Sequence, residues 1–520
     1  MVGNTRHGLT IQLYGNVITV RAYGYGGGGV RRLSVVGLVT LLFLAVARPA
    51  SAADRAQGDF ARVDAYVQEQ RERTRAPGLA YAVISGEQVV HQRTWGQDGN
   101  GTPVTPRTPF LIGSVSKPVT AMAVMRLAEE GRIALDGTVR ERLPWFTPSG
   151  DGGERITVRQ LLTHTSGISE REGYLRSDRY DNEPGGIMRL ARSLADVRLN
   201  AHPGERHEYS DANYMLLAAV VEQVTGRPFG DHLRDSVLQP LGMSGAITDA
   251  RTAENAGLAP GHRYFFGRPQ AYAPPFDTSG VPYGYLGVNL EDLSRFAIAQ
   301  LGGPQTVLSQ DGIRQMHTGT VPVRDAHRYG LGWRDDAFDD LGVRTVWHAG
   351  ATPGYHSILI LAPEKKLAVV VEQNIYGTQN DELLGATAFG ALRLLLGAEA
   401  QPADEDPLFA RILTVLAAVT ALLGAGVVWS LFRLARPPSV QRKASRRRAL
   451  AGGVSAVVAC LLLAATAYAV FPGQVATDLR QVLLFAPDAG RLIIAVSALA
   501  LALAVLRAAV TVRSMSHRTR

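Results

Sequence analysis

Three long apolar segments near the C-terminus constrain the fold of this chain more than any other feature. They span residues 412–432, 449–471 and 492–512, each 21 to 23 residues long. A helix of about 20 apolar residues crosses a hydrocarbon core of about 30 Å. Lipid offers no partners to backbone polar groups, so a segment of this kind must be helical. The sequence therefore predicts three transmembrane helices.

Basic residues around these segments predict the orientation of the chain. The loop 433–448 holds seven lysines and arginines and the tail 513–520 holds three, whereas the loop between the second and third segments has two arginines. Cytoplasmic loops are enriched in such residues. We therefore expect loop 433–448 and the C-terminus to be cytoplasmic, with residues 401–411 as a linker and the preceding body extracytoplasmic.

The N-terminal region carries an export pattern. Arg31 and Arg32 precede a short apolar stretch, and Ala50-Ser51-Ala52 has the small-x-small form of a cleavage site. This pattern predicts a signal peptide over residues 30–52, cleaved after Ala52. Residues 1–29 include four consecutive glycines and no core-forming pattern, so we interpret them as untranslated or disordered, with translation starting near Val30.

The body, residues 53–400, is mildly acidic although the whole chain has a net charge of +8. The basic excess lies in the terminal segments, which argues against nucleic acid as a partner. The only cysteine, Cys460, lies in the second apolar segment. The body therefore cannot use disulfides, thiol chemistry or a thiolate metal site.

Apolar runs at the two ends of the body predict strands, and the sequence between them is mostly helical. Leu79 to Ile84 and Gln88 to Trp95 flank a tight turn and predict a hairpin. Three further strands are predicted at 343–348, 357–361 and 367–372, and a helix at 54–75. The pattern predicts an α+β fold, in which strands from both ends close one antiparallel sheet and helices flank it.

The tetrad Ser114-Val115-Ser116-Lys117 is the strongest chemical signal in the body. The chain holds only four lysines against fifty arginines. Unlike arginine, a desolvated lysine can lose its proton and act as a base toward a serine hydroxyl. The following residues predict a helix that ends near Gly131, so Ser114 lies at a helix N-terminus, where developing negative charge is favoured.

Four segments together carry a family resemblance. Ser114 to Lys117 is followed by Leu161-Leu162-Thr163-His164-Thr165-Ser166-Gly167, then by Tyr209-Ser210-Asp211, and finally by His348-Ala349-Gly350 on a predicted strand. In this order and spacing they resemble class C β-lactamases and related penicillin-recognising serine hydrolases over about residues 60 to 395. The resemblance implies a β-lactamase-like fold with a mostly helical subdomain.

The same resemblance implies roles for individual residues. Ser114 would be the acyl-accepting nucleophile, and Lys117 would help to deprotonate it. Tyr209 would act as a general base or proton shuttle, its phenol pKa lowered by the nearby Lys117. His348 would contact the substrate or the proton network, and the backbone N–H groups of Ser114 and Ala351 would form an oxyanion hole.

Further residues would bind the substrate or support the site. We expect Asp211, Asn213 and Gly350 to contact the substrate. His164, in a turn whose side chains bond to the backbone, is interpreted as structural. The histidines show no metal-ligand spacing, so we expect neither a metal nor another cofactor.

Two departures from the family pattern bear on the substrate. Asp211 stands where the family has asparagine, and it could either repel a substrate carboxylate or tune Lys117. His348-Ala349 replaces Lys-Thr, which removes a fixed cation and a hydroxyl. Both departures favour a D-amino-acid peptidase or esterase with weak or no β-lactamase activity.

The sequence therefore predicts a membrane-anchored extracytoplasmic serine hydrolase. Its substrates would be peptides, amides or esters, cell-wall fragments among them. The alternative is a non-hydrolytic sensor of β-lactams or wall fragments that acts through a membrane partner. Transport is the weakest hypothesis, because the three apolar segments carry no central charged residue.

Overall fold

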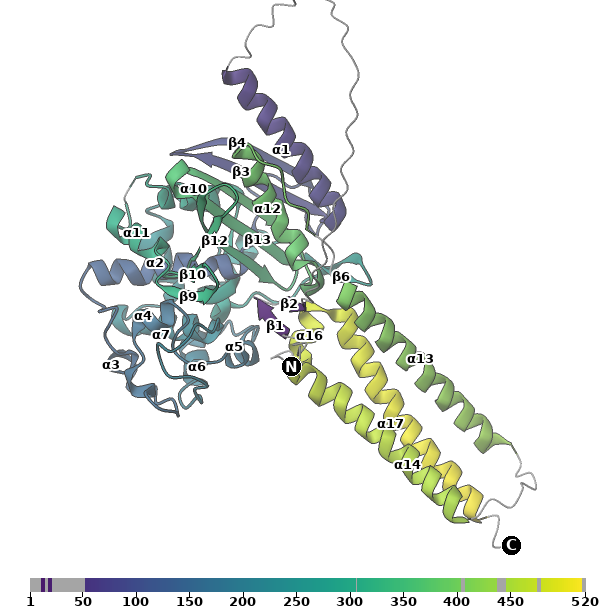
Figure 1. Cartoon of the computed structure of the whole chain (residues 1–520). Coiled ribbons are helices and arrows are strands. Elements are labelled where there is room, and N and C mark those ends of the chain that lie inside the picture. Colours follow the sequence, from purple (N-terminus) through teal and green to yellow (C-terminus); the bar gives the residue numbers. More distant parts are fainter. Residues whose placement is uncertain are drawn as a thin grey trace, which may run out of the picture.

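The computed structural model describes residues 11–14, 17–20, 52–304, 306–403, 407–436, 446–474 and 478–516. The predicted signal peptide, apart from Ala52, lies outside these residues. A body of helices and strands sits at one end of a bundle of three long helices (Figure 1).

An eight-stranded antiparallel sheet forms the centre of the body. Its strands lie in the order β4 (Gln88–Gly96), β3 (Gly78–Ser85), β14 (Leu367–Gln373), β13 (Tyr355–Ala362), β12 (Val343–Thr352), β11 (Arg334–Phe338), β10 (His327–Tyr329) and β9 (Val321–Arg324). Val369 of β14 lies opposite Val83 of β3. This pairing confirms the predicted closure of the sheet by strands from both ends of the body.

Helices cover both faces of this sheet because its central strands are apolar on both sides. Along β3, Tyr81 and Val83 pack into one core, and Ala80 and Ala82 pack into the other. This alternation follows from the two-residue period of a strand. The first core lies under α1 (Ala52–Thr74) and α12 (Asp381–Leu395), and the second under α2 (Ser116–Glu129) and α10 (Leu290–Gln300).

The helical subdomain lies between β4 and β9 in the chain. Besides α2 and α10 it comprises α3 (Val139–Arg142), α4 (Val158–Leu162), α5 (Glu170–Arg176), α6 (Gly186–Arg192), α7 (Asp211–Thr225), α8 (Phe229–Leu233), α9 (Ala250–Asn255) and α11 (Gln310–His317). Two small sheets accompany it, one of β5 (Phe110–Leu111) and β8 (Gly287–Val288), the other of β15 (Ile375–Tyr376), β6 (Gly261–Phe265) and β7 (Arg268–Tyr272). The sequence had not predicted these small sheets or the strands β9 to β11.

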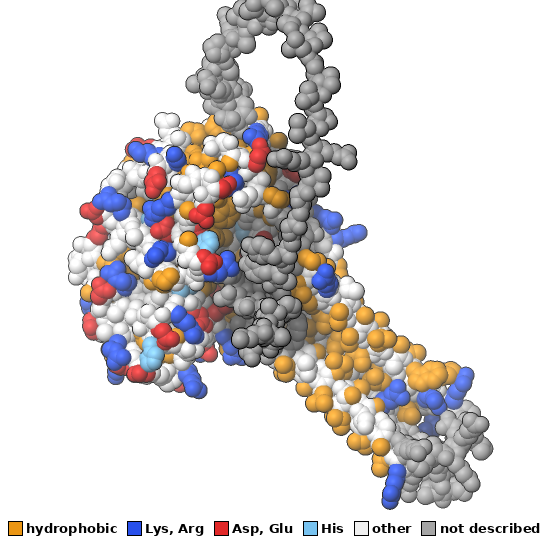
Figure 2. Space-filling view, viewed as in Figure 1, with side chains coloured by type: hydrophobic (Ala, Val, Ile, Leu, Met, Phe, Trp, Pro, Cys, Tyr) orange, Lys and Arg blue, Asp and Glu red, His pale blue; other side chains and the backbone are white. Residues whose placement is uncertain are grey.

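The three predicted membrane segments are helices long and apolar enough to cross a membrane. They correspond to α13 (Pro407–Ala435), α14 (Arg446–Ala465) with the turns that follow it, and α17 (Pro487–Ser516). Large apolar side chains such as Leu422 and Val505 are about 70% exposed on the bundle. Figure 2 shows this apolar surface, with basic side chains at the end away from the body.

Two short elements complete the bundle on the side of the body. After α14, the helix α15 (Phe471–Gln474) ends the second span, and α16 (Leu479–Phe485) precedes the third. Asp478 caps α16, since its Oδ1 accepts a hydrogen bond from the Gln481 amide at 2.9 Å. The described part of this loop before the third span is therefore a capped helix.

Within residues 1–29 the structure describes two short strands. β1 (Ile11–Tyr14) and β2 (Val17–Val20) pair as an antiparallel hairpin in a sheet of their own. Tyr14 and Val17 are paired across a two-residue connection, a common hairpin length.

Candidate active site

Ser114 lies in a single 3-10 turn, Gly113–Val115, that leads directly into α2. Its neighbours in sequence are buried, whereas Ser114 is partly exposed. Gly113 has a φ of +51°, and a Cβ at this position would come within 2.1 Å of the Ala351 nitrogen. Only glycine allows the turn to approach β12 this closely.

Gly350 meets the same turn from the side of β12. A Cβ on Gly350 would lie 2.0 Å from the Ile112 carbonyl oxygen and 2.7 Å from the Ser114 nitrogen. The Ser357 hydroxyl on β13 holds the turn in place by donating to the Ile112 carbonyl at 2.6 Å. Because Gly113 and Gly350 have no side chains, the backbone at Ser114 and the backbone at Ala351 can approach closely, as an oxyanion hole requires.

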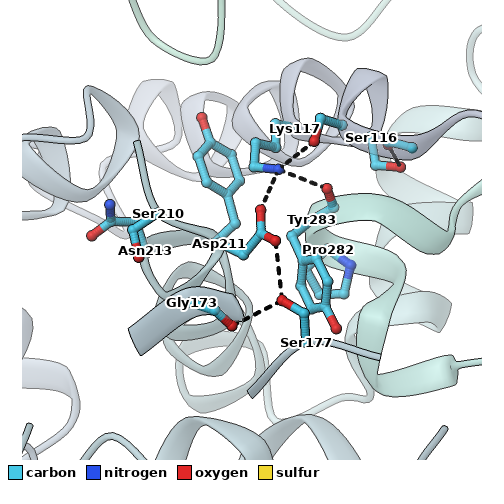
Figure 3. Close-up of polar contacts among 12 residues, drawn as sticks. Ser116, Lys117, Gly173, Ser177, Ser210, Asp211, Asn213, Pro282 and Tyr283 are labelled. Atoms are coloured by element: carbon cyan, nitrogen blue, oxygen red, sulfur yellow. Dashed lines mark hydrogen bonds and ion pairs between the residues drawn. The ribbon is translucent and has the colours of Figure 1, made fainter. Parts of the chain in front are cut away.

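Lys117 is fully buried one helical turn after Ser114. Its Nζ lies 2.8 Å from the Ser114 Oγ, 2.8 Å from the Tyr283 carbonyl oxygen and 2.7 Å from Asp211 Oδ1. Figure 3 shows the amine converging with Asp211 and Tyr283. Two hydrogen bonds and the ion pair with Asp211 define the position of the amine.

Two opposing influences act on the charge of Lys117. Burial lowers its pKa, and Asp211 raises it; the net shift is downward. The positive charge of Arg334 adds to the lowering. A neutral amine is therefore easier to reach here than on an exposed lysine.

Asp211 is the first residue of α7, where the helix dipole favours a carboxylate. Its Oδ1 faces Lys117, and its Oδ2 accepts a hydrogen bond from the Ser177 hydroxyl at 3.0 Å. Of the two effects expected for this residue, tuning of Lys117 is the one that the contacts support.

Tyr209 lies over the same amine, with Lys117 Nζ 4.9 Å from the ring centroid. The expectation of a lowered phenol pKa was wrong. Burial raises the pKa of Tyr209 well above its ordinary value, and Asp211 acts in the same direction. Burial of the ring therefore keeps the phenol protonated.

His164 and Asn213 lie beneath the site and do not line the pocket. His164 Nδ1 accepts a hydrogen bond from the Ser210 amide at 3.1 Å and lies 3.0 Å from the Asn213 amide nitrogen. Asn213 Oδ1 accepts a further bond from the Ser166 hydroxyl. These contacts agree with a structural role for His164, but they place Asn213 away from any substrate.

His348 is buried on β12 beside Tyr209, with ring centroids 6.1 Å apart. Its Nδ1 is 2.7 Å from the Ala349 carbonyl oxygen and its Nε2 is 3.1 Å from the Tyr329 hydroxyl. Burial lowers the pKa of His348, and the charges of Lys117 and Arg334 lower it further. The imidazole is neutral and supplies no fixed cation.

Arg334 is the cation that the sequence analysis missed. It begins β11 opposite Trp347 and lines the pocket, with its Cζ 5.1 Å from the Trp347 ring and 5.9 Å from the Tyr209 ring. Within the described part of the chain it forms no ion pair with a carboxylate. No local sequence pattern distinguishes Arg334 from the other arginines of the chain. It reaches the pocket that contains Ser114 only because β11 pairs with β12.

The pocket around Ser114 has a volume of about 390 Å³. Ser114, Tyr209, Asp211, His348, Gly350 and Ala351 line it, so most predicted site residues meet in one cavity. Tyr174, Ser177 and Tyr283 also line it. Among the described residues, no three His, Cys, Asp or Glu side chains gather closely enough to hold a metal.

The fold and pocket are those of a β-lactamase-like hydrolase. The profile of the beta-lactamase family matches residues 63–390, and the chain belongs to this family. This confirms the resemblance inferred from the four motifs and the predicted fold class.

Individual relatives are distant. Protein flp of Staphylococcus aureus strain MW2 is 27% identical over 320 residues, which is 60% of this chain and 63% of that protein. An unguisins hydrolase of Aspergillus campestris is 27% identical over 365 residues, covering 64% of this chain and 65% of its own. The chain thus spans less than two thirds of the length of these relatives.

Solved structures support the fold. The octameric penicillin-binding protein homologue from Pyrococcus abyssi matches with a TM-score of 0.57 and 28% identity, over 68% of this chain and 81% of that one. EstCE1, a hydrolase with promiscuous acyltransferase activity, matches with a TM-score of 0.54 and 22% identity. The match covers 64% of this chain and 99% of EstCE1. The latter likeness shows the fold alone.

Proposed function

We propose that the protein is a membrane-anchored serine hydrolase that works through an acyl-enzyme on Ser114. Its substrates would be esters, amides or peptides of D-amino acids. The observation that carries the proposal is the buried amine of Lys117, which lies 2.8 Å from the Ser114 hydroxyl oxygen with a lowered pKa. This pairs a nucleophile with a base without a His–Asp couple.

In the acylation step, the neutral amine of Lys117 accepts the Ser114 proton as Oγ attacks the substrate carbonyl. The ammonium that forms is stabilised by Asp211 at 2.7 Å. The carbonyl oxygen gains negative charge and would accept hydrogen bonds from the Ser114 and Ala351 amides. The proton then passes to the leaving alcohol or amine, and the acyl-enzyme remains.

Deacylation reverses these roles with water as the nucleophile. Lys117 takes a proton from water, the hydroxide adds to the ester carbonyl, and Ser114 Oγ leaves with the proton returned. Tyr209 stays protonated because its pKa is raised, so it donates to the reacting oxygens and does not act as the base. This reassigns the base from Tyr209 to Lys117.

The cations of the site bear on substrate choice. Arg334 places in the pocket a guanidinium that has no carboxylate partner among the described residues, suited to a substrate carboxylate. His348 is neutral, and Ala349 has no hydroxyl to hold a β-lactam carboxylate from the opposite strand. The neutral His348 and the missing hydroxyl at Ala349 support weak or no β-lactamase activity, whereas Arg334 supports a substrate with a carboxylate, such as a peptide C-terminus.

We place the body on the outer side of the cell membrane. Arg433 and Arg513 lie in the last turns of α13 and α17, and Arg447 lies in the first turn of α14. Figure 2 shows basic side chains at the end of the bundle away from the body. Because basic residues favour the cytoplasmic side, this arrangement supports an extracytoplasmic body and a cytoplasmic C-terminus.

One experiment tests the proposal directly. The full-length protein in detergent is treated with a fluorophosphonate, and the modified residue is identified by mass spectrometry. In parallel it is assayed with p-nitrophenyl esters, D-Ala-D-Ala peptides, D-aminoacyl amides and a chromogenic cephalosporin. No adduct on Ser114 would reject the proposal, and an adduct without turnover of any substrate would favour the sensor alternative.

A further inference from the structure

The helix α16 belongs to the membrane part of the chain, yet it packs against the body beside the pocket. It lies in the loop between the second and third spans, at the junction of bundle and body (Figure 1). Its contacts with the body reach residues about 300 positions earlier in sequence. Hydrogen bonds and apolar contacts at both ends of α16 hold it against the body.

The first turn of α16 is bound to the segment after α5. Arg480 donates from Nη2 to the Tyr174 carbonyl and from Nη1 to the Asp178 carbonyl, both at 3.1 Å. Gln481 is 4% exposed, and its Nε2 donates to the Tyr174 carbonyl at 3.0 Å and to Asp178 Oδ2 at 2.7 Å. Asp178 is fixed from its other side by the Tyr285 hydroxyl at 2.6 Å.

The last turn of α16 is bound to β6. Arg263 donates to the carbonyls of Leu483 and Leu484 at 3.0 and 3.4 Å. The last carbonyls of a helix have no partner within the helix, so these bonds satisfy groups that would otherwise be buried unpaired. Phe485 packs edge-on against Tyr376, with ring centroids 5.8 Å apart. Both ends of α16 are therefore held to the body.

Two side chains of α16 line the same pocket as Ser114. They are Gln481 and Phe485. Phe485 and Ala351 both line the pocket, and both pack against one apolar cluster formed by Ala76, Tyr264, Ile375, Tyr376 and Leu384. The wall of the pocket at Phe485 is therefore apolar, and it is supplied by the membrane loop.

A short chain of contacts links α16 to the catalytic amine. The segment held by Arg480 and Gln481 includes Ser177, whose hydroxyl donates to Asp211. Asp211 in turn pairs with Lys117, as Figure 3 shows. Movement of α16 would therefore shift the carboxylate that stabilises the Lys117 ammonium.

We infer that α16 is a working part of the active site: it forms the wall that receives an apolar group of the substrate and positions the Ser177–Asp211 contact. The substrate class is an ester or amide with an apolar group that extends from the scissile carbonyl toward the membrane. This inference rests on the proposed function and adds to it a substrate preference and a role for the membrane loop. Gln481 and Phe485 are specificity residues, and Arg480 is a positioning residue.

The preference of the enzyme for long over short acyl chains tests whether α16 forms the wall that receives the apolar group. The full-length protein in nanodiscs is assayed with p-nitrophenyl acetate and p-nitrophenyl octanoate. In Phe485→Ala, the ratio of kcat/KM for octanoate over acetate should fall about tenfold, because a lost apolar contact discriminates by this order. Val482→Ala is the matched control, since Val482 on the same helix packs against the membrane helices; its ratio should equal that of the wild type. An unchanged ratio in Phe485→Ala would overturn the inference.

Hydrogen exchange tests the positioning without relying on activity. In the double variant Arg480→Ala and Gln481→Ala, amides of residues 170–180 should lose protection at least tenfold relative to the wild type and to Val482→Ala. Equal protection in all three proteins would refute the docking of α16, whatever their activity. A wild type that hydrolyses neither ester and takes no label on Ser114 would instead count against the proposed function.

Discussion

The amine of Lys117 lies 2.7 Å from Asp211 Oδ1, and the lysine side chain is fully buried. Burial of an ion pair is costly unless both charges find further partners. Here the ammonium also reaches the Ser114 hydroxyl and the Tyr283 carbonyl, and the carboxylate also accepts from Ser177. The pair therefore sets the protonation of the amine that would activate Ser114.

Asp211→Asn should shift the pH dependence of hydrolysis to lower pH. Activity requires neutral Lys117, so kcat/KM rises with pH through the pKa of Lys117, and Asp211 raises that pKa. Loss of the carboxylate should move the rising limb down by about one to three pH units. The measurement is the pH profile of kcat/KM for a short p-nitrophenyl ester, which reports the free enzyme. If the rising limb of the pH profile does not move, Asp211 does not control the pKa of Lys117.

Lys117→Arg should abolish acylation while the protein stays folded. Arginine keeps the charge but cannot give up its proton, so Ser114 loses its base and labelling by a fluorophosphonate should slow by about 10²- to 10⁴-fold. Overpacking of the buried position should cost about 1 to 3 kcal/mol, measured by thermal unfolding. Lys365→Arg, in an exposed turn, is the control and should label normally. Near-normal labelling of Lys117→Arg would remove this lysine from the mechanism.

Gly350→Ala should disrupt the catalytic turn. The added methyl would meet the Ile112 carbonyl oxygen at 2.0 Å and the Ser114 nitrogen at 2.7 Å, and both are backbone atoms that cannot move aside cheaply. We expect a loss of about 10²-fold or more in acylation rate, because the oxyanion donors would separate. Gly452→Ala, where a Cβ would meet nothing within 4 Å, serves as the comparison. If Gly350→Ala acylates at the wild-type rate, the oxyanion hole lies elsewhere.

Arg334→Ala should weaken binding of substrates that carry a carboxylate. A hydrogen-bonded ion pair to a carboxylate is worth about 1.5 to 3 kcal/mol, so KM for a D-Ala-D-Ala peptide should rise by about 10- to 100-fold. The same peptide with an amidated C-terminus provides the internal control, because it offers no negative charge. Equal effects on both peptides would show that Arg334 acts only through the fold.

Local sequence patterns were sufficient to predict several helices and strands. The hairpin of β3 and β4, the helix after Ser114 and the three membrane helices were predicted, because alternation, turn residues and apolar length act within a short stretch of chain. The strands β9 to β11 were missed, since they are short and partly exposed.

In the candidate site, too, some residues could be predicted from local motifs and others could not. Ser114, Tyr209 and His348 were predicted from motifs and do line one pocket, and the predicted Lys117 is buried beside it, with its Nζ 2.8 Å from the Ser114 Oγ. Asn213 was misplaced, because its direction depends on the buried His164 that it contacts. The pKa of Tyr209 was misjudged in sign, because burial is a property of the packed molecule.

The sequence by itself determined the class of fold, the order of the catalytic motifs and the three membrane helices, since each depends on residue type and spacing along the chain. Only the tertiary structure decided which charges face Lys117, that Arg334 lines the pocket as a cation, and that Gln481 and Phe485 of α16 line it too. These depend on strand pairing and on contacts between residues hundreds of positions apart. Such contacts leave no periodic pattern in the sequence, because their energy comes from burial and geometry that exist only after the chain has folded.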